Sequence, residues 1–142
     1  MPVQHAKAFV PVAWYRVQVE DAVVGLFTEC TGLTVEYEVL PYAAGGDDFV
    51  HQLPGRKKYQ NLVLKRGMTK DKALTTWFNQ TKKRESRGAV TISLLTQATK
   101  DVRKWTFSHA HPIKWEGPTL SARGGIVAIE VLEIAHEGFQ EL

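Results

Sequence analysis

The chain has 142 residues, 44% of them hydrophobic, and its 18 basic and 15 acidic residues give a formal net charge of +3. This length is typical of one domain with a core of its own, which we expect to span residues 1–142 with residues 1–8 as a mobile arm. The mild charge gives no argument for nucleic-acid binding, and no apolar run suits a membrane span or a secretory signal, so we expect assembly in the cytoplasm.

The N-terminal part of the chain is predicted to form β-strands. Its apolar patterning places strands at residues 12–19, at residues 24–31 as the hairpin partner of the first, and at residues 33–42. In the third strand Glu36 and Glu38 share one face, so we expect one face in solvent and one packed. Alternating carboxylates on a strand are typical of a solvent or interface face, not of a catalytic pair. The opposite, apolar face consists of Leu33, Val35, Tyr37 and Val39.

Residues 41–56, PYAAGGDDFVHQLPGR, have the composition of a long ordered loop. Gly45-Gly46 and Pro54-Gly55 are typical turn residues, and four apolar side chains argue against a disordered linker. Loops of this length are uncommon in compact domains unless they have a function. We therefore expect this loop to pack against its own domain or against a neighbouring molecule. The apolar anchors are Tyr42, Phe49, Val50 and Leu53.

A strand at residues 61–65 is predicted to lead through a turn at Arg66-Gly67 into the one helix of the chain. Thr69 is placed to cap that helix, and Asp71 in its first turn suits the positive end of the helix dipole. Basic residues 82–84 suit the negative end. At about 100° per residue, the helix has a single apolar face. That face consists of Ala73, Leu74, Trp77, Phe78 and Thr81.

The rest of the chain returns to β-structure. Strands are predicted at residues 89–96, 102–110 and 126–135. His111-Pro112 is expected to end the second of these strands. The last strand is apolar on both faces, with Val131 on the second face, so both faces require cover. Six or more strands with one helix predict an antiparallel β-barrel or sandwich flanked by that helix.

Few side chains suggest chemistry. The single cysteine, Cys30, has no partner for a disulfide, and we expect a buried structural thiol. His109 and His111 lie two residues apart on a predicted strand and are the best candidates for metal ligands, but no third ligand stands at motif spacing. No nucleophile elbow, phosphate loop or dinucleotide motif is present, so we predict no catalysis and no cofactor.

A series of motifs points to one family: CTGLTVEYE, YAAGGDDF, LPGRKKYQNLVLKRGMTKD with ALTTW, VRKWTF, PIKWEGP and VAIEVLEIAHEGF. From about Phe9 to Phe139 the chain resembles the tail tube family of contractile phages, the T4-type tail tube, and the inner tube proteins of extracellular contractile injection systems. The resemblance implies a tail-tube or Hcp-like barrel whose copies form hexameric rings, and these rings stack into a hollow tube. It also implies a sheath, a tube terminator cap, a baseplate and spike hub, and cargo effectors or DNA in the lumen.

By the same resemblance the protein is a structural part of a phage virion tail or of a released extracellular particle. The loop at residues 41–56 is then expected to reach a neighbouring subunit and the next ring. Arg56, Lys57 and Lys58 lie within reach of Asp47 and Asp48 along this loop, which suggests a salt-bridged contact between rings. The residues expected at subunit interfaces are Glu36, Glu38, Tyr42, Gly45, Gly46, Asp47, Asp48, Phe49, Leu53, Arg56, Lys57 and Val131.

Two other functions remain open from the sequence. One is the hexameric ring protein of a type VI secretion system, which belongs to the same structural class. The other belongs to a different class: a small β-barrel binding protein or a metal enzyme that uses His109 and His111.

Overall fold

The computed structural model describes residues 12–20, 22–80, 88–118 and 128–142. The predicted arm at residues 1–8, the basic residues 82–84 and the predicted strand start at residues 126–127 lie outside the described residues. The elements in chain order are β1 (Trp14–Val19), β2 (Ala22–Phe27), β3 (Glu29–Thr31), β4 (Val35–Tyr42), β5 (His51–Tyr59), β6 (Leu62–Gly67), α2 (Ala73–Gln80), β7 (Gly88–Leu95), β8 (Asp101–Glu116), β9 (Ile129–Ala135) and β10 (Phe139–Glu141).

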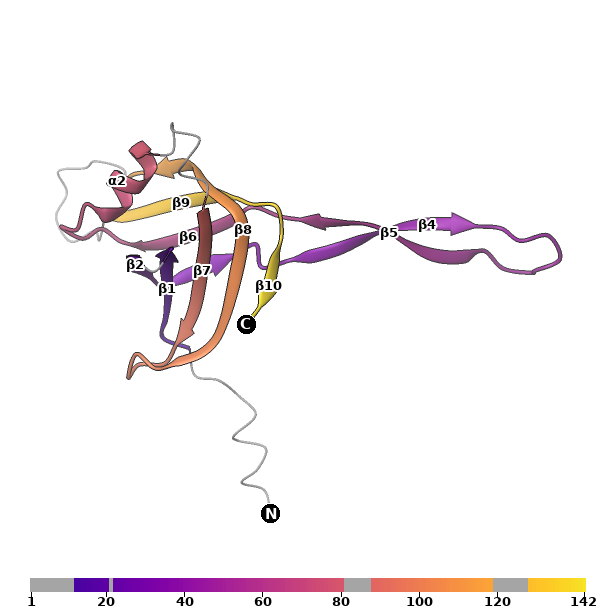
Figure 1. Ribbon diagram of the computed structural model, residues 1–142, viewed down its shortest axis with the longest axis horizontal. Coiled ribbons are helices and arrows are strands. Elements are labelled where there is room, and N and C mark those ends of the chain that lie inside the picture. Colours follow the sequence, from indigo (N-terminus) through magenta and orange to yellow (C-terminus); the bar gives the residue numbers. More distant parts are fainter. Residues whose placement is uncertain (1–11, 21, 81–87, 119–127) are drawn as a thin grey trace, which may run out of the picture.

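Most strands form one antiparallel sheet that closes into a barrel (Figure 1). The order of the strands is β2-β1-β7-β8-β9-β6-β3, and β10 pairs with β8 beside this path. The two ends of the order, β2 and β3, follow each other in the chain, and the N–H of Thr28 between them donates to the carbonyl of Lys65 on β6. This hydrogen bond ties the two ends of the strand order together. The predicted mainly β fold with a flanking helix is confirmed for the described residues.

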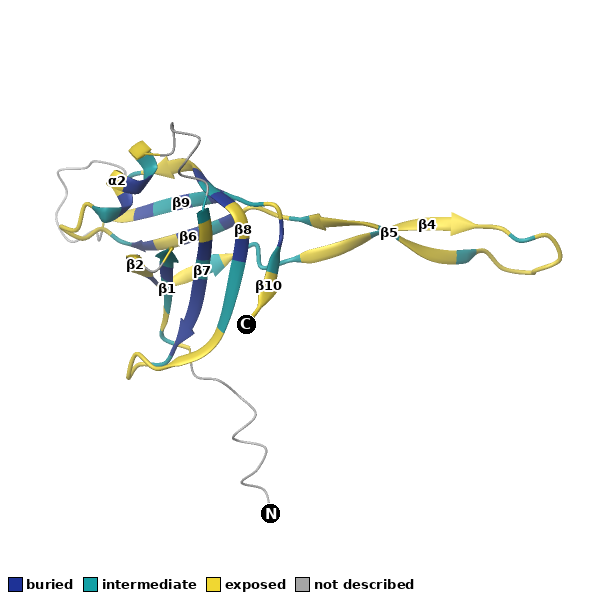
Figure 2. Ribbon diagram, viewed as in Figure 1, coloured by how far each residue is buried: buried dark blue, intermediate teal, exposed yellow. Residues whose placement is uncertain are grey.

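The inside of the barrel is filled by alternate residues of its strands (Figure 2). Burying these side chains removes apolar surface from water, which is the dominant favourable term in folding. Their fully buried members include Val17, Phe27, Leu62, Leu64, Ile92, Phe107, Leu132 and Ile134. Helix α2 contacts β2 and β8 and adds Leu74 and Trp77 to the same cluster, as its apolar face predicts.

The helix begins later than the sequence suggests. The N–H of Asp71 donates to Thr69 Oγ1 at 3.3 Å, and the N–H of Ala73 donates to Asp71 Oδ1 at 3.0 Å. Asp71 is thus the residue whose side chain caps the first helical turn, and Thr69 orders the approach to it. The predicted cap at Thr69 is therefore wrong: the cap is Asp71, two residues later, and the helix begins at Ala73.

Two predicted strand ends are also wrong. Strand β6 continues through Arg66 and Gly67, which pair with Glu130 and Ile129, so no turn forms there. Strand β8 continues through Pro112 to Glu116, leaving β7 and pairing with β9. At Pro112 the strand has only β9 beside it, and proline is tolerated where a strand has a free edge.

A buried ion pair stands among the core side chains. Arg66 Nε donates to Glu130 Oε1 at 2.9 Å, and each residue is only 5% exposed. The guanidinium also lies 4.8 Å from the ring centroid of Phe27. A Cβ at Gly25 would lie 2.1 Å from Arg66 Nη1, so glycine at this position leaves the room that the guanidinium needs.

Cys30 on β3 is half-buried and packs against the core, and burial raises the pKa of its thiol to about 12. Because the thiolate is the reactive form, we expect iodoacetamide to alkylate the folded protein at pH 8 roughly a thousandfold more slowly than the unfolded chain. Alkylation timed by mass spectrometry, with and without denaturant, measures the ratio. Equal rates would contradict the buried position.

No helix in the described part of the chain is long and apolar enough to cross a membrane.

Candidate subunit interface

Strands β4 and β5 leave the barrel together and form a separate two-stranded hairpin that projects far from it (Figure 1). The sequence reading of residues 41–56 as a loop is therefore wrong: only residues 43–50 connect the strands, and β5 runs from His51 to Tyr59. Pro54 and Gly55, read as turn residues, lie inside β5. Since a two-stranded sheet has free edges on both sides, proline can be accommodated there.

The hairpin holds one extra residue in β5. Tyr37 pairs with Lys57 and Val39 with Pro54, so Gly55 and Arg56 both stand opposite Glu38. This is the arrangement of a β-bulge, which leaves the alternation of β4 intact. A Cβ added at Gly55 would lie 3.1 Å from Glu38 Cβ, so position 55 is on the same face of the hairpin as the Glu38 side chain.

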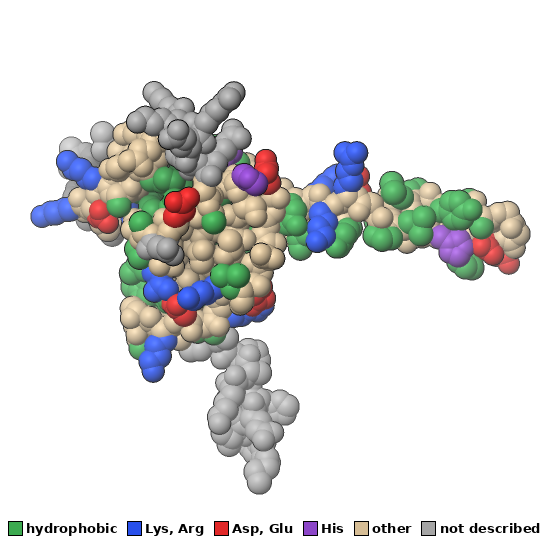
Figure 3. All heavy atoms as spheres, in the orientation of Figure 1, with side chains coloured by type: hydrophobic (Ala, Val, Ile, Leu, Met, Phe, Trp, Pro, Cys, Tyr) green, Lys and Arg blue, Asp and Glu red, His purple; other side chains and the backbone are tan. Residues whose placement is uncertain are grey.

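The two halves of the hairpin differ. Near the barrel, Val35 and Tyr37 lie on one face together with Lys57, which pairs with Tyr37. Charged Glu36, Glu38 and Lys58 lie on the other face. Farther out, Val39, Pro41 and Pro54 continue the first face beside Gln52, which pairs with Pro41. Leu40, Tyr42 and Leu53 lie on the second face beside His51, which pairs with Tyr42. We call these two parts the root half and the outer half. Figure 3 shows hydrophobic side chains along the outer half and Lys and Arg side chains closer to the barrel.

These apolar side chains are uncovered in the single chain (Figure 2). The valine and leucine side chains of β4 and β5, together with Tyr37 and Tyr42, are 47–58% exposed, and Phe49 in the connection is 63% exposed. The expectation that Val35, Tyr37 and Val39 form a packed face is therefore not met within one chain, because β4 has left the barrel. A monomeric protein rarely exposes so much contiguous apolar surface.

The charged side chains of the hairpin contact residues close to them on the same hairpin. Lys58 Nζ lies 3.3 Å from Glu38 Oε1, Asp47 Oδ2 lies 2.7 Å from His51 Nε2, and Lys57 stands 5.6 Å from the centroid of the Tyr37 ring. Asp47 and Asp48 belong to the connection and Arg56 to the root half, so these groups are separated along the hairpin. The expected salt bridge between them does not form within the chain, and a contact between copies stays a prediction.

The point where β5 joins the barrel is fixed by an aromatic cluster. The ring of Tyr59 meets His136 at 5.7 Å and Phe139 at 5.4 Å, and Phe107 meets the same two rings at 4.9 and 5.3 Å. Both imidazole nitrogens of His136 are engaged, since Nε2 lies 2.8 Å from the carbonyl oxygen of Gln60 and Nδ1 accepts the N–H of Gly138 at 3.1 Å. The neutral ring with its proton on Nε2 satisfies both bonds. This cluster sets the direction in which the hairpin leaves.

Gly138 completes the cluster with a φ of 129°, in the region that favours glycine. A Cβ there would also lie 3.2 Å from the Tyr59 ring. We expect Gly138→Ala to lower the free energy of unfolding by about 1–3 kcal/mol, measured by urea denaturation. Gly45→Ala is the matched control, because nothing lies within 4 Å of that position. Equal losses in the two variants would contradict this role.

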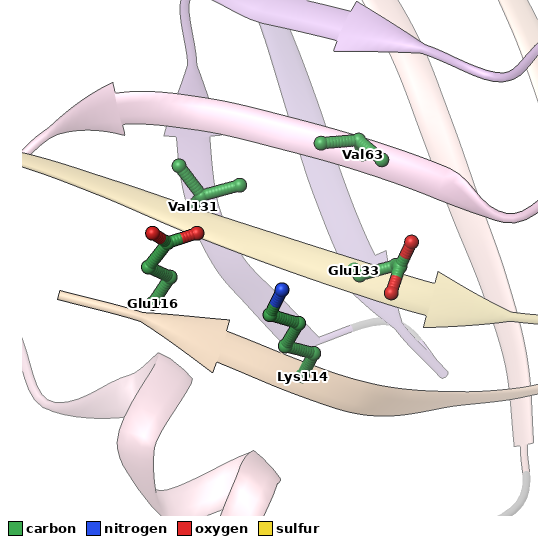
Figure 4. A pocket seen from close by; sticks show the side chains of 5 residues that line it. All are labelled: Val63, Lys114, Glu116, Val131 and Glu133. Carbon is green, nitrogen blue, oxygen red and sulfur yellow. The ribbon is translucent and has the colours of Figure 1, made fainter.

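Val131 lies apart from the hairpin, on the outside of the barrel. It alternates with buried Glu130 and Leu132, and it lines a depression of about 170 Å³. Figure 4 shows this surface, where Val131 and Val63 form an apolar floor. The charged residues around that floor are Lys114, Glu116 and Glu133. A second depression of about 410 Å³ lies beside the start of α2, between Trp115, Glu130 and Leu74.

The predicted interface residues thus fall into two places. All of them except Val131 lie on the hairpin, as strand residues Glu36, Glu38, Tyr42, Leu53, Arg56 and Lys57 or as tip residues Gly45, Gly46, Asp47, Asp48 and Phe49. Leu40, Pro41 and Pro54 of the outer half and Val63 in the depression at Val131 lie beside these residues and are not among the predicted interface residues. The side chain of Pro54 can be assigned to a face only because β5 is a strand there.

The histidines considered as metal ligands have other contacts. His109 Nδ1 lies 3.0 Å from Glu137 Oε2, and His111 is half-buried beside β9. Among the described residues, no group of three His, Cys, Asp or Glu side chains is placed to hold a metal ion.

Several solved structures share this fold. A chain of the extracellular contractile injection system PVC, in a sheath-tube complex in the extended state, has a TM-score of 0.80 and 23% identity over 100% of this chain and 97% of its own. A chain of the anti-feeding prophage baseplate has a TM-score of 0.72 and 27% identity over 94% and 95%. Hcp1 from Flavobacterium johnsoniae has a TM-score of 0.53 and 11% identity over 90% and 94%. No curated protein matches the chain.

The sequence itself matches a family model over nearly its whole length. That model describes the T4-like virus tail tube protein gp19, and it matches residues 11–140, which include β1 to β9 and the first two residues of β10. The chain therefore belongs to the T4-like virus tail tube protein family.

Proposed function

We propose that this chain is the inner tube subunit of a contractile phage tail or of a related extracellular injection particle, in which six copies form a ring and rings stack into a hollow tube. The tail tube family is a structural one, and its role is to build a tube. The observation that carries the proposal is the hairpin, whose exposed apolar side chains require cover from other molecules. An isolated two-stranded hairpin is at best marginally stable in water, so a neighbouring copy is needed to hold it.

Ring closure requires a heterologous contact, in which two different surfaces of the subunit meet and a rotation closes the circle. The chain offers two such surfaces, the hairpin and the outer face of β9 around Val131. We assign the first to contacts that include the next ring and the second to the neighbour within the ring.

The similar structures support the remaining partners that we propose. One similar chain comes from a sheath-tube complex, another from a baseplate and a third from a tube terminating cap. We propose that this subunit likewise contacts a sheath, a baseplate and spike hub, and a terminator cap. Assembly takes place in the cytoplasm, and the lumen holds cargo effectors or DNA.

The mass of the purified protein in solution tests the proposal. We expect sedimentation equilibrium at rising concentration to show a species of about six times the 16.0 kDa chain mass, followed by larger stacks. A species that stays at the chain mass, both alone and after addition of a preformed baseplate, would overturn it.

Val131→Asp tests the ring contact. Because Val131 faces outward, this substitution should leave the barrel folded but bury an added carboxylate beside Glu116 and Glu133 in the closed ring. We expect unchanged circular dichroism and thermal unfolding, with loss of the six-chain species. Gln97→Asp, in the exposed β7–β8 turn, is the control and should assemble normally. Rings of normal yield from Val131→Asp would show that this face stays in solvent.

A further inference from the structure

We propose that the depression of about 410 Å³ beside α2 is a binding site for a small protonated amine. In this site the ammonium group is held by Glu130, and the apolar part of the ligand lies against Trp115. The lining residues belong to one chain and are separate from the hairpin and from the depression at Val131. Binding of the amine therefore does not require assembly of the subunits.

The depression lies at one mouth of the barrel. Glu130 on β9 and Arg66 on β6 pair with each other. Each stands two positions along its strand from a fully buried leucine, Leu132 and Leu64 respectively, so both side chains continue the inner face of the barrel. Trp115 on β8 pairs with Leu132 and lies on the same face, yet it is 42% exposed. Mouths of β-barrels are common places for small-ligand sites.

Glu130 is a buried carboxylate with only one of its oxygens bonded. Its side chain is 6% exposed, and Oε1 accepts a hydrogen bond from Arg66 Nε at 2.9 Å. No hydrogen bond from the described residues reaches Oε2. Glu130 lines the depression, whereas Arg66 is not among the described residues that do so. Because buried polar atoms almost always have a hydrogen-bond partner, Oε2 requires a donor, and the depression gives a ligand access to it.

The other walls favour a cation that carries an apolar part. Trp115 offers an aromatic surface, and Leu74 and Met68 add aliphatic surface. An ammonium group is attracted to the face of an indole ring, and a charged donor makes a stronger hydrogen bond to a carboxylate than a neutral donor does. Water can also bond Oε2, but it leaves the apolar walls in contact with solvent. An amine with a hydrocarbon part covers both kinds of surface.

The rim of the depression carries charges of both signs. Asp71 accepts the N–H of Ala73 with Oδ1, so its second oxygen adds negative charge at the rim. Lys70 and Lys72 are exposed, and their long side chains can extend into water. These lysines favour an anion at the rim, but an anion that enters further meets the buried carboxylate of Glu130. The charge preference of the site therefore reports how deeply a ligand binds.

Titration of the full chain with benzylamine at pH 7 tests the proposal, at a protein concentration where sedimentation shows a single species. Binding is followed by the NMR signals of the four tryptophan indole N–H groups. The signal of Trp115 is assigned by its absence from the spectrum of Trp115→Leu. We expect saturable binding with a dissociation constant of about 1 mM, and the largest shift at Trp115.

Two uncharged or oppositely charged analogues separate the ammonium group from the ring. Benzyl alcohol and phenylacetate keep the aromatic ring, and each should bind at least about tenfold more weakly than benzylamine because neither offers Glu130 a charged donor. Equal or tighter binding of phenylacetate would overturn the proposal, since the rim lysines would then determine the preference. A titration in which the Trp115 signal does not move would also overturn it.

Substitutions locate the bound amine, with broadening of the benzylamine signals as the measure of binding. Glu130→Gln should weaken binding at least about tenfold. That substitution also alters the bond to Arg66, so Trp115→Leu, at an exposed position, is the second variant and should weaken binding about fivefold or more. Glu133→Gln, on the outer face of β9, is the matched control and should bind normally. Unchanged binding in both site variants would overturn the proposal without affecting tube formation.

Discussion

Replacing residues 38–56 by Asn-Gly should give a folded barrel that no longer forms tubes. Tyr37 and Lys57 pair with each other in the hairpin, so a two-residue turn can join them without a change of register. None of the removed residues belongs to the hydrophobic core cluster, and the aromatic cluster at Tyr59 and His136 is kept. We therefore expect thermal unfolding close to that of the intact protein.

Assembly, in contrast, should be lost. The removed segment contains the whole outer half, whose apolar faces are exposed in the single chain. Sedimentation velocity should show single barrels or isolated rings where the intact protein gives long stacks. Added to intact protein, the shortened chain should also shorten the tubes, because it offers no hairpin to the next ring. Tubes of normal length from the shortened chain would contradict the role of the hairpin.

The second large effect is expected inside the barrel, at Arg66→Met. The Arg66–Glu130 pair is bonded at 2.9 Å and almost completely buried, so removing the guanidinium leaves a carboxylate without its partner. Loss of one partner of a buried pair typically costs about 3–5 kcal/mol of stability. Urea denaturation of the monomeric protein measures the loss, which is a large part of the stability of a small domain.

Two companion variants separate the ion pair from simple packing. Arg66→Met combined with Glu130→Leu should recover most of the lost stability, because apolar side chains often replace a buried pair without cost. Gly25→Ala should be strongly destabilising alone and milder beside Arg66→Met, since the Cβ would collide with the guanidinium. A double variant as unstable as Arg66→Met would show that the unpaired charge is not the cause of the lost stability. If Arg66→Met leaves the free energy of unfolding unchanged, the ion pair does not stabilise the fold.

Much of the barrel could be predicted from the sequence because local patterns and burial agree there. The apolar face of α2 points to the core through Leu74 and Trp77, and alternation in β7 and β9 matches the buried positions of their strands. The last strand was expected to have two faces needing cover, and the structure shows one of them, around Val131, on the outside of the barrel.

The errors arise where local signals have two meanings. Pro54 and Gly55 favour turns, but an edge strand with a bulge accommodates both, so a strand was read as a loop. Pro112 was taken as a strand end, but it lies where β8 exchanges one partner strand for another. Arg66-Gly67 resembles a turn between a strand and a helix, but the pairing of Arg66 with Glu130, 64 positions away, keeps the residue buried in β6.

The candidate interface was predicted in its location but not in its form. The resemblance of the motifs to tail tube proteins directed attention to residues 41–56 and to Val131. The side chains that share each face of the hairpin depend on the register of β4 against β5. That register is set by the bulge opposite Glu38, which composition does not reveal.

Negative-stain electron microscopy of the purified chain at high concentration tests the central claim most directly. The account predicts six-fold rings and hollow tubes built by this chain alone. Fields of single barrels, unchanged when a baseplate is added to start growth, would contradict it.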